Sequence, residues 1–231
     1  MILGEENMVL KETKHFKIIN INDEHHWHQE RSKGIGGSDA GIICNLSPYK
    51  TPYELWEEKT GLKKAKFVTN DAIELGNALE PILFELFKAT KKEYEVIDTK
   101  DISLVSKAYP FMRANLDGAL IDENRRYGIL EIKTTTIQNM TMYGKWKDGV
   151  PDTYYAQVLH YLNTTGFKFV VLFAWIKLPF WNKEELRTYY FDAEDEQVKS
   201  DMAYVLEQEK EFWNKVETRT PPAFISRKII I

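Results

Sequence analysis

The chain has 231 residues and a formal net charge of −4; 43% of its residues are hydrophobic and 29% are charged. This length suits one domain with a packed core, and no apolar run approaches the ~20 residues of a membrane-spanning helix. A general DNA coat is usually basic, so the negative charge confines any nucleic-acid contact to a local basic patch. The single cysteine, Cys44, excludes an intrachain disulfide and any metal site built on several cysteines. The first residues lack the pattern of a signal peptide, so we expect a cytoplasmic protein.

The first quarter of the chain predicts one strand and several short helices. Residues 1–25 are expected to be a variable lead-in that holds a short strand near residues 16–21. A polar helix is expected to start at residue 23, and the glycines at 34–41 force a turn before the next helix. Ser38 or Asp39 can cap that next helix, and residues 51–61 show a helix start, apolar spacing and a glycine stop.

Residues 71–89 give the clearest predicted helix, because apolar residues recur at the three- and four-residue spacings of one helical face. These residues are Ala72, Ile73, Leu75, Leu79, Ile82, Leu83, Leu86 and Phe87. Pro81 lies inside the stretch and is expected to bend the helix without ending it.

The rest of the chain alternates strands with helices. Strands are predicted near residues 94–97, 102–107, 111–121, 127–134, 167–177 and 187–191. Helices are predicted at 137–147, 153–164 and 194–218. This order is typical of an α/β domain with a central mixed β-sheet flanked by helices, and we expect residues 1–231 to form one domain.

Two acidic residues and a lysine lie on two neighbouring predicted strands. Asp117 and Glu131 are fourteen positions apart, and a turn at residues 122–126 would bring them to one end of a hairpin. Side chains alternate along a strand, so Glu131 and Lys133 share a face while Ile132 points into the core. Two carboxylates and the Ile132 carbonyl are hard oxygen ligands that suit Mg²⁺, which can activate water for phosphodiester hydrolysis. The alternative is an ordinary solvated strand edge with a Glu–Lys pair.

Two helices carry further candidates. Glu80 is either a third carboxylate of the metal site or a surface acid on an amphipathic helix. Gln157 and Tyr161 share a helix face, so Gln157 could orient the site while Tyr161 approaches a DNA backbone. The alternative places this amide and phenol in packing between helix and sheet. His160, between them, is expected to pack or give polar support.

These pieces, in this order, resemble the PD-(D/E)XK nuclease superfamily, and more narrowly the phage lambda exonuclease and YqaJ-type viral recombinase family. The segment Arg-Ser-Lys-Gly-Ile-Gly-Gly-Ser-Asp-Ala, from Arg31 to Ala40, is similar to the opening motif of that family. The matched stretches run from about residue 27 to residue 175. The proline that gives the superfamily its name is replaced by Leu116, at a position that varies widely.

The resemblance implies a restriction-endonuclease-like fold and a metal-dependent exonuclease that digests double-stranded DNA ends 5′→3′ and generates single strand for recombination. It implies that Asp117, Glu131 and the Ile132 carbonyl bind one or two Mg²⁺ ions, for which Mn²⁺ can substitute, with Glu80 nearby. Lys133 would activate or position the nucleophile. Gln157 would support it.

The resemblance also implies DNA contacts and partners. Arg31 and Ser38 correspond to residues that grip phosphate, although a surface ion pair and a helix cap are the plain alternatives. Asn115 stands where the family often has a serine that contacts DNA. Members of the family can form homotrimers and act with a single-strand annealing protein in a phage or bacterial host cell.

Three other functions stay open at this stage. The same fold also serves structure-specific or site-specific endonucleases and single-strand exonucleases. A non-catalytic protein that binds DNA ends is the third. Trp27, Trp56 and Trp146 could stack on bases, but tryptophan is more often a core or interface residue.

Overall fold

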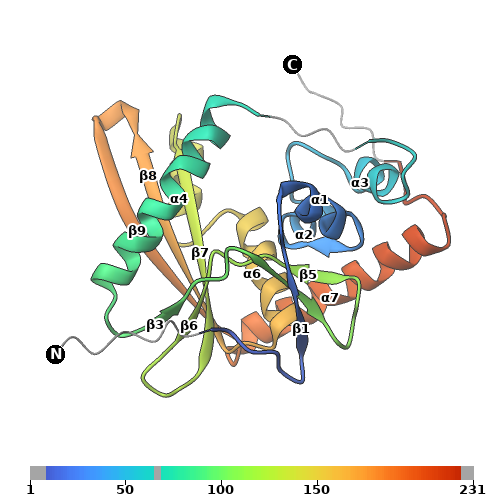
Figure 1. The fold of residues 1–231 in the computed structure, drawn as a ribbon. Helices are drawn as coiled ribbons and strands as arrows, with labels where there is room; N and C mark the ends of the chain where they lie inside the picture. The colour runs from blue at the N-terminus through green and yellow to red at the C-terminus, as the bar shows by residue number, and fades with distance from the viewer. Residues whose placement is uncertain (1–8, 65–68, 225–231) are drawn as a thin grey trace.

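The computed structural model describes residues 9–64 and 69–224, and the strands of this part of the chain form two β-sheets with helices packed around them (Figure 1). The four-stranded sheet has the order β1-β4-β5-β2, with β1 Phe16–Asn20, β4 Ile102–Ser106, β5 Met112–Ala114 and β2 Ile35–Gly36. The five-stranded sheet has the order β3-β6-β7-β8-β9, with β3 Glu95–Ile97, β6 Gly118–Ile121, β7 Tyr127–Thr136, β8 Phe169–Leu178 and β9 Lys183–Asp192. The predicted α/β class is confirmed, but the strands divide between two sheets where the sequence predicted one central sheet.

The five-stranded sheet is mixed, because β7 runs antiparallel to β6 and parallel to β8. A parallel pair needs a crossover connection. The chain between β7 and β8 supplies it with two helices, α5 Met140–Lys147 and α6 Asp152–Thr165. Gly166 ends α6 with a φ of 68°, the left-handed conformation that glycine adopts most readily.

The other α-helices of the described residues are α1 Glu24–Ser32, α2 Gly37–Ile43, α3 Pro52–Lys59, α4 Asp71–Thr90 and α7 Glu196–Glu217. Side-chain hydrogen bonds cap the starts of α3 and α2. The Thr51 side chain accepts a hydrogen bond from the Glu54 N–H while the Glu54 carboxylate accepts one from the Thr51 N–H. At α2 the Asp39 carboxylate accepts from the Gly36 N–H at 3.0 Å, so Asp39 closes this helix start and Ser38 is left for other contacts.

The stretch 111–121, predicted as one strand, is broken where the two sheets meet. β5 belongs to the four-stranded sheet and β6 to the five-stranded sheet. Between them the Leu116 carbonyl accepts a hydrogen bond from the Thr99 hydroxyl at 2.6 Å, and the Asp117 side chain binds β7. These bonds take the chain out of ladder pairing and place Asp117 at the junction.

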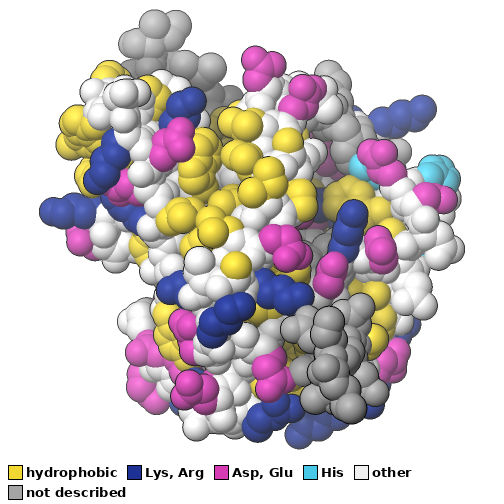
Figure 2. All heavy atoms as spheres, turned by 60° about the vertical axis from the view of Figure 1, so that its left-hand side comes forward, with side chains coloured by type: hydrophobic (Ala, Val, Ile, Leu, Met, Phe, Trp, Pro, Cys, Tyr) yellow, Lys and Arg dark blue, Asp and Glu magenta, His cyan; other side chains and the backbone are white. Residues whose placement is uncertain are grey.

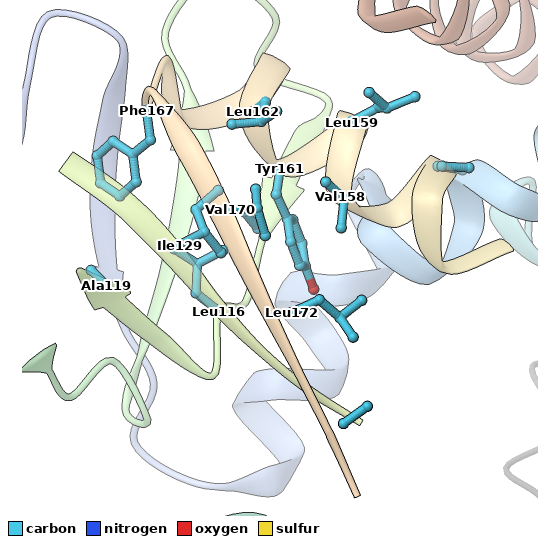
Figure 3. Packing of buried hydrophobic residues seen from close by; sticks show 14 of the residues in the cluster. Leu116, Ala119, Ile129, Val158, Leu159, Tyr161, Leu162, Phe167, Val170 and Leu172 are labelled. Carbon is cyan, nitrogen blue, oxygen red and sulfur yellow. The ribbon is translucent and has the colours of Figure 1, made fainter. Parts of the chain in front are cut away.

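The five-stranded sheet has a buried layer on each face. Figure 1 shows α4 crossing one face, and Figure 3 shows α6 side chains, including Tyr161 and Leu162, packed against the other. β7 alternates between these layers: Ile129 joins the α6 side, while Leu130 and Ile132 join the cluster with α4. The prediction that Ile132 points into the core is therefore confirmed. The same alternation sends Glu131 and Lys133 toward α6.

The apolar face of α4 is only partly buried, although the spacing of its apolar residues suggested one continuous buried face. Leu83 and Phe87 pack against the sheet, but Ile73, Leu75 and Ile82 are exposed. A groove runs between α4 and β9 and is lined by Leu79, Ile82, Leu83, Leu86, Trp175, Glu184, Glu185 and Leu186. Figure 2 shows hydrophobic side chains gathered in a band across this face. Within the described ranges no helix is long and apolar enough to span a membrane.

Candidate active site

Asp117 meets β7 at the point where β6 begins. The last ladder pair joins Gly118 to Leu130, and two residues further along β7 the Ile132 N–H donates to Asp117 Oδ2 at 2.6 Å. The carboxylate thus takes the place that a main-chain carbonyl of a longer strand would occupy. The hairpin brings Asp117 beside the Glu131–Lys133 segment, as the sequence predicted.

Glu131 lies next to Asp117, with its side chain under α6 and only 2% of its surface exposed. One carboxylate oxygen, Oε1, accepts from Lys133 Nζ at 2.6 Å and from Gln157 Nε2 at 2.7 Å. Lys133 Nζ also donates to Gln157 Oε1 at 3.1 Å and lies 4.8 Å from the ring centroid of Tyr154. Gln157 therefore holds the acid and the amine at once.

Two buried oxygens near this group have no hydrogen-bond partner among the described residues, Glu131 Oε2 and Asn115 Oδ1. Buried polar atoms are nearly always paired, so an unpaired one indicates a missing ligand or water. For Glu131 the unpaired atom is a carboxylate oxygen next to a second carboxylate. Such hard oxygen donors suit a divalent cation.

The acidic group is electrostatically strained. Burial, followed by repulsion from Glu131, raises the pKa of Asp117 well above its ordinary value. Burial also raises the pKa of Glu131, although Lys133 opposes this shift. Burial works against the charged form of Lys133, but the attraction of Glu131 and Asp117 outweighs it and raises the pKa of Lys133. A bound cation would stabilise both carboxylates in their charged forms.

Glu80 stands apart from the other two acids. It lies on α4 with an exposed side chain, and its pKa is raised by partial desolvation of the carboxyl group and by Glu131. The charges of Glu80 and Asp117 influence each other, but no hydrogen bond joins them. Within residues 9–64 and 69–224, no three His, Cys, Asp or Glu side chains already converge as a set of metal ligands. The structure thus brings Asp117, Glu131, Lys133 and Gln157 together and leaves Glu80 near their edge.

Tyr161 is buried, in contrast to its predicted approach to a DNA backbone. Its side chain is 5% exposed, and its hydroxyl donates to the Asn115 carbonyl at 2.9 Å and accepts from Gln157 Nε2 at 3.0 Å. α2 presses on the same ring, because a Cβ on Gly37 would lie 2.6 Å from Tyr161 Cε1. The alternative that the sequence left open, packing between helix and sheet, is the one observed.

Arg31 and Ser38 lie directly beside this packing. The Arg31 guanidinium donates to the Ser38 hydroxyl and lies 5.0 Å from the centroid of the Trp27 ring. Ser38 follows Gly37 in α2, and the charge of Arg31 reaches Tyr161, as do the charges of Glu131 and Asp117. The pair that the sequence predicted to bind phosphate is therefore a neighbour of the acidic group across Tyr161.

A buried ion pair supports the turn that carries Ser38. Lys59 Nζ lies 2.8 Å from Asp39 Oδ2 and donates to the Gly34 carbonyl at 2.6 Å. Burial works against the charged form of Asp39, but Lys59 and Arg31 outweigh it and lower the pKa of Asp39 to about 2. Trp56 and Trp146 are buried, which favours the core interpretation for both, while Trp27 stacks on Arg31.

Sequence reasoning missed one charged residue close to the site, Glu209. It is fully buried on α7 and pairs with His160, one residue from Tyr161. A signal was present, because Glu209 follows Val205 by four positions and precedes Phe212 by three, on the buried face of its helix. For His160 the expectation of packing or polar support agrees with the structure.

Comparisons with known proteins agree with this architecture. A family model for the YqaJ-like viral recombinase domain matches residues 26–168. The uncharacterized protein YqaJ of Bacillus subtilis (strain 168) is 36% identical over 158 residues, which are 67% of this chain and 47% of that protein. The chain thus spans about half the length of this curated relative.

Solved structures share the fold at low sequence identity. An alkaline exonuclease from Laribacter hongkongensis matches with a TM-score of 0.59 and 17% identity, over 84% of this chain and 93% of that chain. A phage related exonuclease from Haemophilus somnus 129PT matches with a TM-score of 0.52 and 11% identity, over 80% and 96% of the two chains. The chain belongs to the YqaJ-like viral recombinase family and has the restriction-endonuclease-like fold of these phage-type exonucleases.

Proposed function

We propose that this chain is a divalent-metal-dependent nuclease that degrades double-stranded DNA from its ends in the 5′→3′ direction and leaves single strand for recombination. The observation that supports it most is the buried group of Asp117, Glu131, Lys133 and Gln157, with the unpaired oxygen of Glu131. Membership of a viral recombinase family and the exonucleases that share the fold point the same way.

The metal would be held by Asp117, Glu131 and the Ile132 carbonyl. In a strand the N–H and C=O of one residue point to the same edge. Since the Ile132 N–H meets Asp117 beyond the start of β6, the Ile132 carbonyl faces the same open edge. One or two Mg²⁺ ions, or Mn²⁺ in their place, would supply a hydroxide nucleophile and stabilise the leaving oxyanion.

Lys133 serves as a donor in this arrangement. Its raised pKa keeps the amine protonated, so it orients the attacking water or a phosphate oxygen by hydrogen bonding and charge. Gln157 fixes the direction of that amine through Oε1 and the position of Glu131 through Nε2. Glu80 would be a further metal ligand if its side chain moved toward a cation bound by Asp117 and Glu131.

Arg31 and Ser38 would bind the terminal 5′-phosphate. A guanidinium and a hydroxyl make charge-assisted hydrogen bonds to phosphate oxygens, and Trp27 stacking limits the motion of the guanidinium. Asn115, by resemblance, would also contact DNA. Tyr161, predicted from sequence as a DNA contact, supports Gln157 in this scheme.

End-labelled duplex DNA tests the proposal directly. Linear duplex with a 5′-phosphate, linear duplex with a 5′-hydroxyl and closed circular duplex are incubated with Mg²⁺ and with EDTA. We expect digestion of the linear substrates only, faster with the phosphate, and none with EDTA. Equal cutting of the circle would favour an endonuclease, and DNA binding with no product under any metal would favour a non-catalytic end-binding protein.

Two variants sharpen this assay. Lys133→Ala should reduce turnover by ~10²-fold or more while retaining DNA binding, because the amine contributes mainly in the transition state. Lys145→Ala removes an exposed lysine of α5 and serves as the matched control, with turnover expected to stay unchanged. Equal turnover of wild type and Lys133→Ala would exclude the proposed site.

We further propose, by resemblance, that the chain forms a homotrimer around DNA and acts with a single-strand annealing protein. The exposed apolar band on α4 and β9 supports self-association, because exposed apolar patches commonly mark interfaces. Sedimentation velocity should give a trimer for wild type and a smaller species for Ile82→Lys combined with Leu186→Lys. A wild-type monomer at tens of micromolar would contradict the trimer.

A further inference from the structure

Behind the proposed site lies a buried ion pair with no part in the chemistry described above. His160 on α6 and Glu209 on α7 are both fully buried, and His160 Nδ1 lies 2.7 Å from Glu209 Oε1. Burying a charged pair costs desolvation energy and stabilises a protein little, so its presence calls for a specific role. The surroundings of the pair indicate what that role is.

Both ring nitrogens of His160 meet acceptors. Nε2 lies 2.9 Å from the Arg113 main-chain carbonyl, which can only accept, so Nε2 carries a proton. Nδ1 faces the Glu209 carboxylate, which also accepts. With an ionised Glu209 both nitrogens donate, and the ring links β5 to α7 through these two hydrogen bonds.

Other charged groups face the pair from each packed element. The charge of Asp39, on α2, acts on His160 from a distance, and the Arg113 side chain on β5 is paired with Glu30 at 2.7 Å. Cys44, which follows α2, has its pKa raised to about 12 by burial and then by the charge of Glu209. Burial opposes the charged form of His160, but Glu209 and the Arg113 carbonyl outweigh it and raise the pKa of His160.

The pair connects to the proposed site by two short paths. Along α6, His160 follows Gln157 by three residues and precedes Tyr161, and its ring centroid lies 5.9 Å from that of Tyr161. Along the other path, Arg113 on β5 precedes Asn115, whose carbonyl accepts from Tyr161, and then Asp117. His160 thus joins the helix that carries Gln157 to the strand β5, which leads to Asp117.

We propose that His160 and Glu209 are positioning residues of the active site, which hold α6 in register with β5 so that Gln157, Glu131 and Asp117 stay aligned. This inference rests on the proposed nuclease function, because the pair acts through Gln157. The alternative is a purely structural role, in which the pair stabilises the fold and leaves turnover unaffected.

Matched substitutions on α6 separate these roles. Asn163 also joins α6 to α7, through a hydrogen bond from Nδ2 to the Met202 carbonyl at 2.8 Å, but makes no contact with the site. We expect His160→Ala to lower kcat by about 10- to 100-fold with little change in the Kd for duplex DNA, since small misplacements of catalytic groups have effects of this size. Asn163→Ala should lower thermal stability and leave kcat within a few-fold of wild type.

Two variants at Glu209 keep the test informative if His160→Ala fails to fold. In Glu209→Gln the ring can become neutral, with Nε2–H still donating to Arg113 and Nδ1 accepting from the new amide, so both hydrogen bonds survive. We expect Glu209→Gln to retain kcat within about threefold and Glu209→Ala to lose it as His160→Ala does, because alignment depends on these bonds. Wild-type kcat in both alanine variants would overturn the proposal.

Two further readouts distinguish failure of the inference from failure of the proposed function. In a Gln157→Ala background, His160→Ala should add no further loss of kcat if it acts through Gln157. Independently of activity, nitrogen-15 NMR of the full chain should show protons on both His160 ring nitrogens at pH 7.5, and on one only in Glu209→Gln. Additive losses of kcat would overturn the inference, while an inactive wild type that keeps both His160 hydrogen bonds in the NMR spectrum would overturn the proposed function.

Discussion

The two carboxylate oxygens of Glu131 have unequal surroundings. Oε1 is bound by Lys133 and by Gln157, while Oε2 is buried without a partner among the described residues. A buried acceptor with no donor costs about 1–3 kcal/mol. Together with the repulsion from Asp117, this cost would be released by a cation bound at the proposed site, which would link metal binding to fold stability at this residue.

The Asp117→Asn variant should separate the effect of this site on fold stability from its effect on metal binding. Because burial and the charge of Glu131 raise the pKa of Asp117, ionisation of this carboxyl group destabilises the metal-free fold. This penalty is absent below the pKa of the unfolded chain and grows as pH rises toward the higher pKa of the folded chain. The neutral amide can still accept from the Ile132 N–H, so we expect a higher melting temperature than wild type in EDTA.

The melting temperatures of wild type and Asp117→Asn are then measured in the presence of metal. Saturating Mg²⁺ or Mn²⁺ should raise the melting temperature of wild type. At a metal concentration 100 times the Kd, the free energy of unfolding should increase by about 2.7 kcal/mol. Asp117→Asn should show little or no rise. Calorimetry in EDTA and in metal measures both effects, and a wild type that does not respond to either ion would contradict the metal site.

Tyr161→Phe tests the support role that the structure assigns to this residue. The hydroxyl bridges the Asn115 carbonyl and Gln157, so its loss should cost about 1–2 kcal/mol of the free energy of unfolding. We expect kcat to fall while the Kd for duplex DNA stays the same. A weaker Kd with unchanged kcat would instead restore the DNA contact predicted from sequence.

At the scale of elements, local patterns predicted most helices and strands, and failures occurred where tertiary contacts decide. The alternation around Glu131 correctly placed Lys133 on the same face and Ile132 in the core. The stretch 111–121 looked like one strand because its break depends on Thr99 and on β7, both distant in sequence. The position of Tyr161 was equally hidden, since periodicity gives a face of a helix and not what covers it.

The contact between α2 and α6 depends on the absence of a side chain at Gly37. An added Cβ would lie 2.6 Å from Tyr161 Cε1 and 2.9 Å from Gln157 Cγ, so the helices would have to separate. We expect Gly37→Ala to destabilise the fold by about 1–3 kcal/mol and to lower kcat. Gly144→Ala in α5 is the control, because nothing lies within 4 Å of its added Cβ, and helix propensity predicts a gain of up to ~1 kcal/mol.

For the whole molecule, the Asp39–Lys59 pair makes stability depend on pH. Asp39 has an ordinary pKa of 3.8 and a folded pKa of about 2, so its contribution is present above pH 3.8 and is lost as pH falls toward 2. The difference between these two pKa values corresponds to about 2 kcal/mol. Asp39→Asn also leaves Lys59 buried without its counter-charge, so at pH 7 the loss should be at least this large.

Urea unfolding at pH 7, 5, 4 and 3 measures this difference. The gap in stability between wild type and Asp39→Asn should be constant at pH 7 and 5 and should narrow at pH 4 and 3. Asp148→Asn, at an exposed position after α5, is the control and should follow wild type throughout. A gap that widens toward low pH would contradict the depressed pKa of Asp39.

The bond from the Ile132 N–H to Asp117 also has a consequence for observing the protein at work. That amide proton belongs to the central strand β7, yet its acceptor is a side chain of the proposed metal site, whose charge would respond to a bound cation. Its exchange with deuterium should therefore slow when a cation holds the Asp117 carboxylate in place and quicken when the cation leaves, whereas amides such as that of Leu130, inside the ladder, should exchange alike in both states. A single backbone proton would then report occupancy of the catalytic centre without any substrate present.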